Sequence, residues 1–135
     1  MLFRSNTFGG NPICCAAALA TLDLVAGGYA DNAAEVGAYF IDRLRELQTR
    51  HQCIGEVRGR GLMIGIELVT DRESREPARE LCKKVLHRAY ENGLILLSCG
   101  VSTVRFMPPL MITRGDVDEA LSILEPSLVE ALDSL

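Results

Sequence analysis

A short run near the beginning of the chain, Thr7 to Pro12, has the residue types that bind phosphate groups. Thr7 offers a hydroxyl, Gly9 and Gly10 offer flexible backbone amides, and the run leads into the positive end of a helix. Amides and a helix N-terminus together suit an anion. The alternative is a tight turn that only feeds the helix. On spacing alone the turn is favoured, because two glycines before a helix are weak evidence.

Arg105 is a second candidate for binding, because it is an arginine inside an apolar strand. Alternation over Thr103 to Met107 puts Val104 and Phe106 on one face and Arg105 on the other. A guanidinium presents a planar fork that suits a carboxylate, and each charge-assisted hydrogen bond contributes about 1.5–3 kcal/mol when shielded from water. A salt bridge to a carboxylate such as Glu67, or a surface position on an edge strand, explains the arginine equally well.

The other basic side chains are weaker candidates. Arg58 and Arg60 flank an expected turn, where solvated charges are the favoured interpretation. Lys83 and Lys84 are the only lysines, and both point off the apolar face of an expected helix, so burial does not activate them as nucleophiles. No cluster of serine, cysteine and histidine suggests a hydrolase.

The cysteines and histidines do not predict a metal site. Five cysteines at positions 14, 15, 53, 82 and 99 leave one over in any complete pairing and form no Cys-x-x-Cys unit. We expect buried thiols in a reducing compartment. Neither His51 nor His87 lies at a metal-ligand spacing from a cysteine or a carboxylate.

Bulk composition predicts one globular domain. The chain has 135 residues, of which 48% are hydrophobic and 24% charged, with a formal net charge of −4. The basic residues are scattered, so nucleic acid is not an expected partner. The apolar runs break before the roughly 20 residues that span a bilayer, and no signal peptide is recognisable. We therefore expect a cytoplasmic protein with no membrane span.

Two helices should come first. Asn11 and Pro12 begin an alanine-rich helix over about 12–26 that ends at a pair of glycines. It is apolar nearly all round, which predicts burial against more than one neighbour. Asn32 and Glu35 have the spacing of a capping box for a second helix over about 32–50. Its expected buried face comprises Ala33, Val36, Phe40, Leu44 and Leu47.

A β-hairpin over Ile54 to Val69 organises the rest of the fold. Gly59, Arg60 and Gly61 form its expected turn. The second strand is nearly apolar on both of its faces. It should therefore be a central strand that is covered on both sides.

The remaining elements complete an α+β fold with helices packed on a small, mostly antiparallel sheet. A third helix should open at Pro77 and end at Gly93, followed by strands over 94–98 and 103–107. Thr113 to Asp116 form a capping box for a final helix. Pro126 should kink or end that helix, leaving 128–135 loosely attached.

Three linked motifs make the chain recognisable. In their order and spacing, they resemble the C-terminal portion of class III pyridoxal-phosphate-dependent aminotransferases of the 4-aminobutyrate and acetylornithine type. The resemblance covers nearly the whole chain. The motifs are Thr7-Phe8-Gly9-Gly10-Asn11-Pro12 with the alanine-rich run after it, Val57-Arg58-Gly59-Arg60-Gly61-Leu62-Met63-Ile64-Gly65-Ile66-Glu67-Leu68, and Val104-Arg105-Phe106-Met107-Pro108-Pro109-Leu110.

The resemblance implies roles for these residues. It implies a fold-type I enzyme in which residues 1–28 end the large-domain segment and residues 29–135 form the small C-terminal domain. Thr7 would bind the cofactor phosphate, in the family from across a dimer interface, and Gly9 and Gly10 would let the backbone approach. Arg105 would bind the carboxylate of the amino acid or 2-oxo acid, and the hairpin would be scaffold.

The implied activity is transfer of an amino group between an amino acid or amine donor and a 2-oxo acid, with pyridoxal phosphate in the complete enzyme. The family's Schiff-base lysine lies upstream of the Thr7 motif, so we expect the 135-residue chain to be inactive alone. Alternatives are a non-catalytic module that binds a carboxylate ligand or a full-length relative, and part of a pyridoxal-phosphate-dependent amino-acid epimerase. The apolar first helix should promote a homodimer or association with a large-domain segment.

Overall fold

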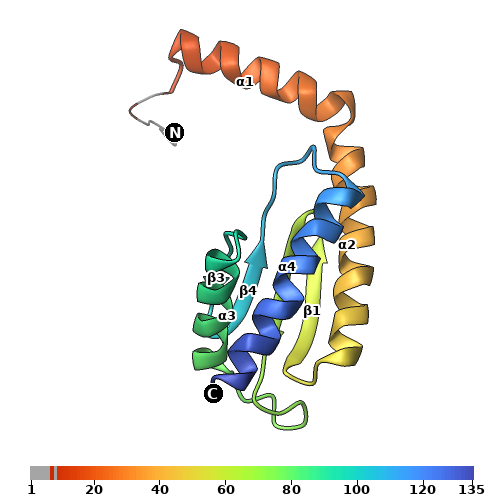
Figure 1. Ribbon diagram of the computed structural model, residues 1–135. Coiled ribbons are helices and arrows are strands. Elements are labelled where there is room, and N and C mark those ends of the chain that lie inside the picture. The colour runs from red at the N-terminus through yellow and green to blue at the C-terminus, as the bar shows by residue number, and fades with distance from the viewer. Residues whose placement is uncertain (1–6, 8) are drawn as a thin grey trace.

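The fold is a sheet with helices on one of its faces (Figure 1), seen here in a computed structural model that describes Thr7 and residues 9–135. The strands form one antiparallel sheet in the order β1-β2-β4-β3. Helices α2 and α3 contact the strands, and α4 packs against both helices. The elements are α1 (Pro12–Leu24), the π-helical segment η1 (Val25–Tyr29), α2 (Ala30–Arg50), β1 (Ile54–Arg60), β2 (Met63–Leu68), α3 (Arg79–Glu91), β3 (Leu97–Cys99), β4 (Thr103–Phe106) and α4 (Arg114–Asp133). The predicted α+β class with a mostly antiparallel sheet is confirmed.

The hydrophobic core lies between this sheet and the three helices. Alternate residues of β2 and β4 point into it, as the strand period requires. The expected face of α2 is buried throughout, as predicted. The inward-facing strand residues are Ile54, Ile64, Ile66, Leu68, Val104 and Phe106.

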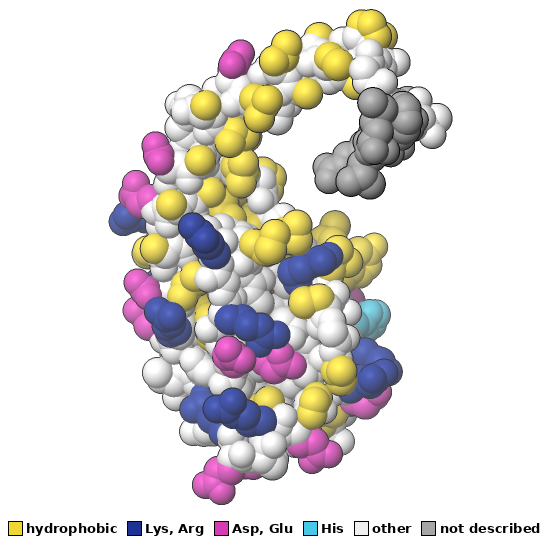
Figure 2. Space-filling view, turned by 180° about the vertical axis from the view of Figure 1, so that it is seen from behind, with side chains coloured by type: hydrophobic (Ala, Val, Ile, Leu, Met, Phe, Trp, Pro, Cys, Tyr) yellow, Lys and Arg dark blue, Asp and Glu magenta, His cyan; other side chains and the backbone are white. Residues whose placement is uncertain are grey.

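The described residues cover the opposite face of the sheet much less than the helices cover the first. β2 is an internal strand, as predicted, but the expectation that both of its faces are covered is wrong for the described part of the chain. Met63 is 64% exposed, and Gly65 and Glu67 are partly exposed. We call this the open face of the sheet. Viewed from behind, it carries basic and acidic side chains close together (Figure 2).

The hairpin turn lies later than the glycines suggested. β1 continues through Gly59 and Arg60, and the turn falls at Gly61 and Leu62. Gly61 has φ of +55°, a left-handed value that favours glycine. A Cβ built on Gly37 of α2 would lie 2.2 Å from the carbonyl oxygen of Gly61, so the helix and the turn touch through backbone.

The predicted capping box of the second helix is wrong. The chain stays helical from α1 through η1 into α2, with one non-helical residue at Gly28 (φ +134°). A helix that does not start at Asn32 has no free amides there for a cap to satisfy. Instead, the Asn32 side chain donates hydrogen bonds to the carbonyl oxygens of Leu110 (2.7 Å) and Ile112 (3.1 Å).

Helix α1 projects away from the rest of the fold (Figure 1) and has no buried residue. The predicted burial is therefore not supplied by any described part of this chain. Ile13 is 80% exposed, and hydrophobic side chains run along the helix surface (Figure 2). An 18-residue window of the continuous helix Pro12–Arg50, with mean hydropathy 1.6, is long and apolar enough to cross a membrane, and a core helix of a larger soluble protein has the same character.

The expectation of buried thiols holds only for Cys82. Cys14 and Cys15 are exposed on α1, and Cys53 and Cys99 are partly exposed. Cys14 and Cys15 are exposed because they lie on α1, which no described residue buries.

Two expectations near the end of the chain need correction. Strand β3 covers Leu97 to Cys99, three residues later than its predicted start, because only these residues pair with β4. Helix α4 has the predicted capping box at Thr113 and Asp116, but it runs unbroken through Pro126. Leu128 and Ala131 are fully buried, so packing beyond the proline offsets the lost hydrogen bond.

The contact between Gly37 and Gly61 leads to a stability prediction. Gly37→Ala should lower the free energy of unfolding by about 2–3 kcal/mol, because the new methyl group would overlap backbone atoms that cannot rotate away. Gly27→Ala is the matched control: a Cβ there meets nothing within 4 Å, and alanine should be neutral or slightly stabilising. Urea denaturation measures both, and equal effects would contradict the contact.

Candidate functional site

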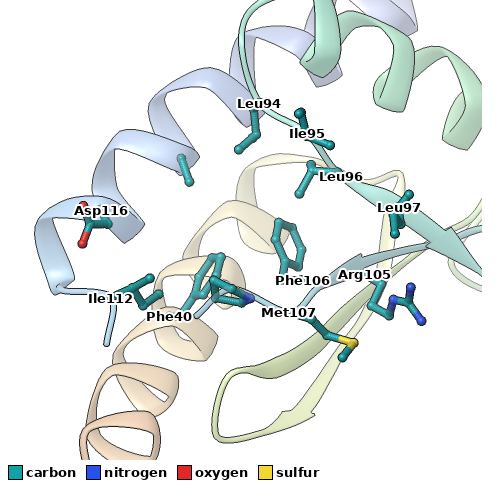
Figure 3. A pocket seen from close by; sticks show the side chains of 12 residues that line it. Phe40, Leu94, Ile95, Leu96, Leu97, Arg105, Phe106, Met107, Ile112 and Asp116 are labelled. Atoms are coloured by element: carbon teal, nitrogen blue, oxygen red, sulfur yellow. The ribbon is translucent and has the colours of Figure 1, made fainter. Parts of the chain in front are cut away.

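Arg105 lies on the open face of the sheet, where the strand alternation predicted it. Its neighbours along β4, Val104 and Phe106, are buried on the helix side. Figure 3 shows the Arg105 side chain pointing away from Phe106. The side chain is partly buried, and its guanidinium makes no hydrogen bond or ion pair with any residue that the structure describes.

The other partly buried arginines of the described chain all have hydrogen-bond or ion-pair partners, unlike Arg105. Arg43 pairs with Glu46 and Asp118, and Arg88 pairs with Glu91. The Arg72 guanidinium donates to the carbonyl oxygens of Ile54, Gln48 and His51. A partly desolvated charge normally has such a partner. Of the partly buried arginines described, only Arg105 has its five donors available for a ligand.

Glu67, the expected alternative partner of Arg105, is bound by other groups. Its Oε2 accepts hydrogen bonds from Arg58 Nη2 (2.6 Å) and from the Thr103 hydroxyl (2.7 Å). Its Oε1 accepts from the Ser102 hydroxyl (3.0 Å). Arg58 is exposed, as expected of a solvated charge, but it lies in β1 and not in the turn, and it is ion-paired with Glu67 and Glu56. Arg60 remains an exposed residue at the end of β1.

These contacts decide how Glu67 ionises. Burial would raise the pKa of its carboxyl group, but the hydrogen bonds from Thr103, Arg58 and Ser102 and the charge of Arg58 together outweigh burial and lower it. The hydrogen bond to Glu67 in turn raises the pKa of Arg58. Glu67 is therefore a carboxylate at neutral pH, and its ion-pair partner is Arg58, which also pairs with Glu56.

An apolar cavity of about 410 Å³ lies beside Arg105. Figure 3 shows that Phe40 from α2 and Phe106 from β4 lie on one side of it and that the segment from Leu94 to Leu97 lies on the other. Arg105 and Asp116 contribute the charged atoms of its lining. Asp116 belongs to the capping box, where its Oδ2 accepts from the backbone amide of Thr113 (2.7 Å). The charge that remains available at the rim is that of Arg105.

The predicted phosphate-binding residues lie before α1. Thr7, Gly9 and Gly10 are all exposed in a turn, and Gly10 has φ of +78° with nothing within 4 Å of a built Cβ. Asn11 caps the helix: its Oδ1 accepts from the amides of Ile13 (3.0 Å) and Cys14 (3.2 Å). The helix amides are thus already used. The exposed hydroxyl and glycine amides still fit a phosphate group, with room for its approach.

The structure does not bring the two predicted sites together. Helix α1 contacts only η1 among the elements of this chain. Arg105 lines the apolar cavity, whereas Thr7, Gly9 and Gly10 do not. A site that used both groups would therefore need a further surface beyond the described residues.

The hydrogen-bonded network of Glu67 with Arg58, Thr103 and Ser102 was not predicted from the sequence, although the alternation of the strands pointed to part of it. Arg58 and Glu67 both lie on the outer side of the hairpin strands by simple alternation. Their pairing depended on the register, which places Gly65 opposite Arg58 and leaves Glu67 diagonal to it.

Comparison with known sequences identifies the family. The sequence model described as "Aminotransferase class-III" matches residues 2–128. The chain belongs to the class III aminotransferase family. It is similar to the isoleucine 2-epimerase of Lentilactobacillus buchneri (42% identical over 120 residues, 88% of this chain and 27% of the relative). It is also similar to the acetylornithine aminotransferase of Caldanaerobacter subterraneus (40% over 128 residues, 94% and 30%).

Solved structures of transaminases share the fold. A transaminase from ancestral reconstruction superposes with a TM-score of 0.90 at 38% identity, covering 100% of this chain and 31% of the other. A PLP-bound amine transaminase from an uncultivated Pseudomonas species gives a TM-score of 0.88 at 36% identity, covering 97% and 30%. The chain thus spans about a third or less of these relatives. The complete enzymes of this family use pyridoxal phosphate as their cofactor.

The Glu67 network predicts a pH-dependent contribution to stability. A lowered pKa in the folded state means that the contribution is present above the unfolded pKa of about 4.3 and is lost as the pH falls through the folded value. Glu67→Gln should therefore lower the free energy of unfolding by about 1–2 kcal/mol at pH 7. The difference should shrink in acid, below the folded pKa.

Urea denaturation at pH 7 and pH 3 measures this difference. Glu80→Gln is the control, because its ion pair with Lys83 is exposed and should contribute little at either pH. A Glu67→Gln effect of the same size at both values would show that the charge of Glu67 is not what stabilises the sheet.

Proposed function

We propose that this chain supplies the carboxylate-binding part of a pyridoxal-phosphate-dependent aminotransferase. The complete enzyme would move an amino group between an amino donor and a 2-oxo acid. The observation that carries the proposal is Arg105: a partly buried guanidinium without a partner among the described residues, on the open face of a rigid sheet. Backbone pairing to β2 and β3 on both sides fixes the position of this residue before a ligand arrives.

The chain is proposed to contain parts of two domains, with residues 1–28 ending the large-domain segment and residues 29–135 forming the small C-terminal domain. Two observations support this boundary. The helix is interrupted at Gly28, and no residue of α1 is buried whereas one face of α2 is. A large-domain segment or a second copy of the chain would cover the apolar surface of α1.

Thr7, Gly9 and Gly10 are proposed to bind the phosphate of the cofactor. The Thr7 hydroxyl and the two exposed glycine amides are its donors, because Asn11 already occupies the first amides of α1. Bound pyridoxal phosphate supplies an electron sink for the reacting carbon. What this chain adds is the hold on the phosphate at one end and the orientation of the substrate carboxylate by Arg105 at the other.

A second candidate is part of an amino-acid epimerase. Among the relatives are proteins named isoleucine 2-epimerase, at 42% identity, and alanine/serine racemase from Pyrococcus horikoshii, at 41%. An arginine that holds a carboxylate serves either reaction equally. Assay of the complete enzyme with a single L-amino acid separates them: an epimerase forms the D-enantiomer without a 2-oxo acid, whereas an aminotransferase requires the acceptor.

The direct test is titration of the chain with 2-oxoglutarate, followed by NMR of the arginine side-chain signals. Arg105→Gln should weaken binding at least about tenfold, because it removes charge-assisted hydrogen bonds. Arg105→Lys should recover part of the affinity, since lysine keeps the charge but not the planar fork. Arg79→Gln is the control, an exposed arginine on α3.

Two results would contradict the proposed function. If wild type and Arg105→Gln bind 2-oxoglutarate equally or not at all, Arg105 is not the carboxylate site. If the 135-residue chain alone turns over an amino donor with pyridoxal phosphate, the need for a large-domain segment is wrong.

A further inference from the structure

We propose that Arg58 is a positioning residue for Arg105: by holding Glu67 in an ion pair, it keeps the Glu67 carboxylate from neutralising the arginine that binds substrate. This inference rests on the proposed function of Arg105. It assigns a purpose to a side-chain network on the open face of the sheet that does not itself touch the ligand.

The register of the sheet makes Glu67 a natural partner for either arginine. Gly65 of β2 lies opposite Arg58 of β1 on one side and opposite Arg105 of β4 on the other. Glu67 is two residues further along the same face, and so it is diagonal to both. Diagonal neighbours in antiparallel strands are about 7–8 Å apart, within reach of an arginine side chain. Gly65 has no side chain to separate them.

The observed contacts show that Glu67 forms its ion pair with Arg58 and not with Arg105. Arg58 Nη2 donates to Glu67 Oε2 (2.6 Å) and also to the Thr103 hydroxyl (3.0 Å), which itself donates to the same oxygen. Ser102, fully buried, donates to the other oxygen. Both oxygens of the Glu67 carboxylate are therefore occupied by donors other than Arg105.

Loss of Arg58 would change this balance. Glu67 would keep the two hydroxyl donors but lose its only ion pair, and Arg105 on the opposite diagonal would then be available to neutralise it. An Arg105 engaged in this way competes with a substrate carboxylate for the same donors. The expected effect is weaker binding without any change to Arg105 itself.

The binding experiment compares four variants in the 2-oxoglutarate titration. Arg58→Gln should weaken binding by up to about fivefold, the factor that corresponds to one partly exposed ion pair. The double variant Arg58→Gln/Glu67→Gln should restore wild-type affinity, because the carboxylate diagonal to Arg105 is gone; Glu56 remains, but it lies on β1, on the far side of β2 from Arg105. Arg58→Lys should keep most of the affinity. Arg114→Gln removes an exposed ion pair to Glu35 and serves as the matched control.

A second measurement needs no ligand and so separates this inference from the proposed function. In the Arg58→Gln background, NMR titration of the Glu67 carboxyl carbon should show a lower pKa with Arg105 present than in the Arg58→Gln/Arg105→Gln variant. With Arg58 intact, replacing Arg105 should leave the pKa of Glu67 nearly unchanged. The first result would show that Glu67 turns to Arg105 once Arg58 is gone.

The outcomes are distinct. If the ligand-free coupling appears but no protein binds 2-oxoglutarate, the pairing is right and the proposed function is wrong. If binding depends on Arg105 but the double variant stays as weak as Arg58→Gln, Arg58 acts only through sheet stability and the inference fails. It also fails if Glu67 couples instead to Arg75, which shares a hollow of about 370 Å³ with Glu56 and Glu67.

Discussion

The ion pair between Arg58 and Glu67 sets the chemistry of the open face of the sheet. Packing of α2, α3 and α4 buries the other face, and the buried apolar residues fix the register of β1, β2 and β4. That register puts Arg58, Arg105 and Glu67 on the same face within reach of each other. Arg58 pairs there with Glu67 and with Glu56, whereas the partly buried Arg105 has no hydrogen-bond or ion-pair partner among the described residues.

The fold therefore holds the charge of Arg105 on a strand that is hydrogen-bonded on both sides. Backbone pairing on both sides holds the β4 backbone, and the adjoining cavity is lined mainly by apolar side chains. A guanidinium near such walls is less well hydrated than one in open solvent, so its hydrogen bonds to a carboxylate are stronger. Such a guanidinium is suited to binding a carboxylate.

The first part of the chain behaves differently. Helix α1 carries a surface as apolar as a core but has no buried residue, and it contacts only η1 among the elements of this chain. The change comes at Gly28, where a single glycine interrupts the helix. The described chain thus joins a two-layer domain with a buried core to a helix that no described residue buries.

The sequence alone determined the class of fold, most of its elements and the side of the sheet on which Arg105 lies. Local rules were sufficient for these features: the helical period placed the buried face of α2, Thr113 and Asp116 began α4, and strand alternation turned Arg105 away from the core. The family motifs then gave Arg105 a role that composition could not.

Only the tertiary structure decided which charges pair and where helices end. Glu67 lay equally close in register to two arginines, and its choice of Arg58 depends on hydroxyl groups that come from a different hairpin. Asn32 does not cap α2 because α2 already begins at Ala30, just after the kink at Gly28. Pro126 stays inside α4 because Leu128 and Ala131 are buried beyond it. In each case, contacts between residues distant in sequence outweighed a local preference of a few kcal/mol at most.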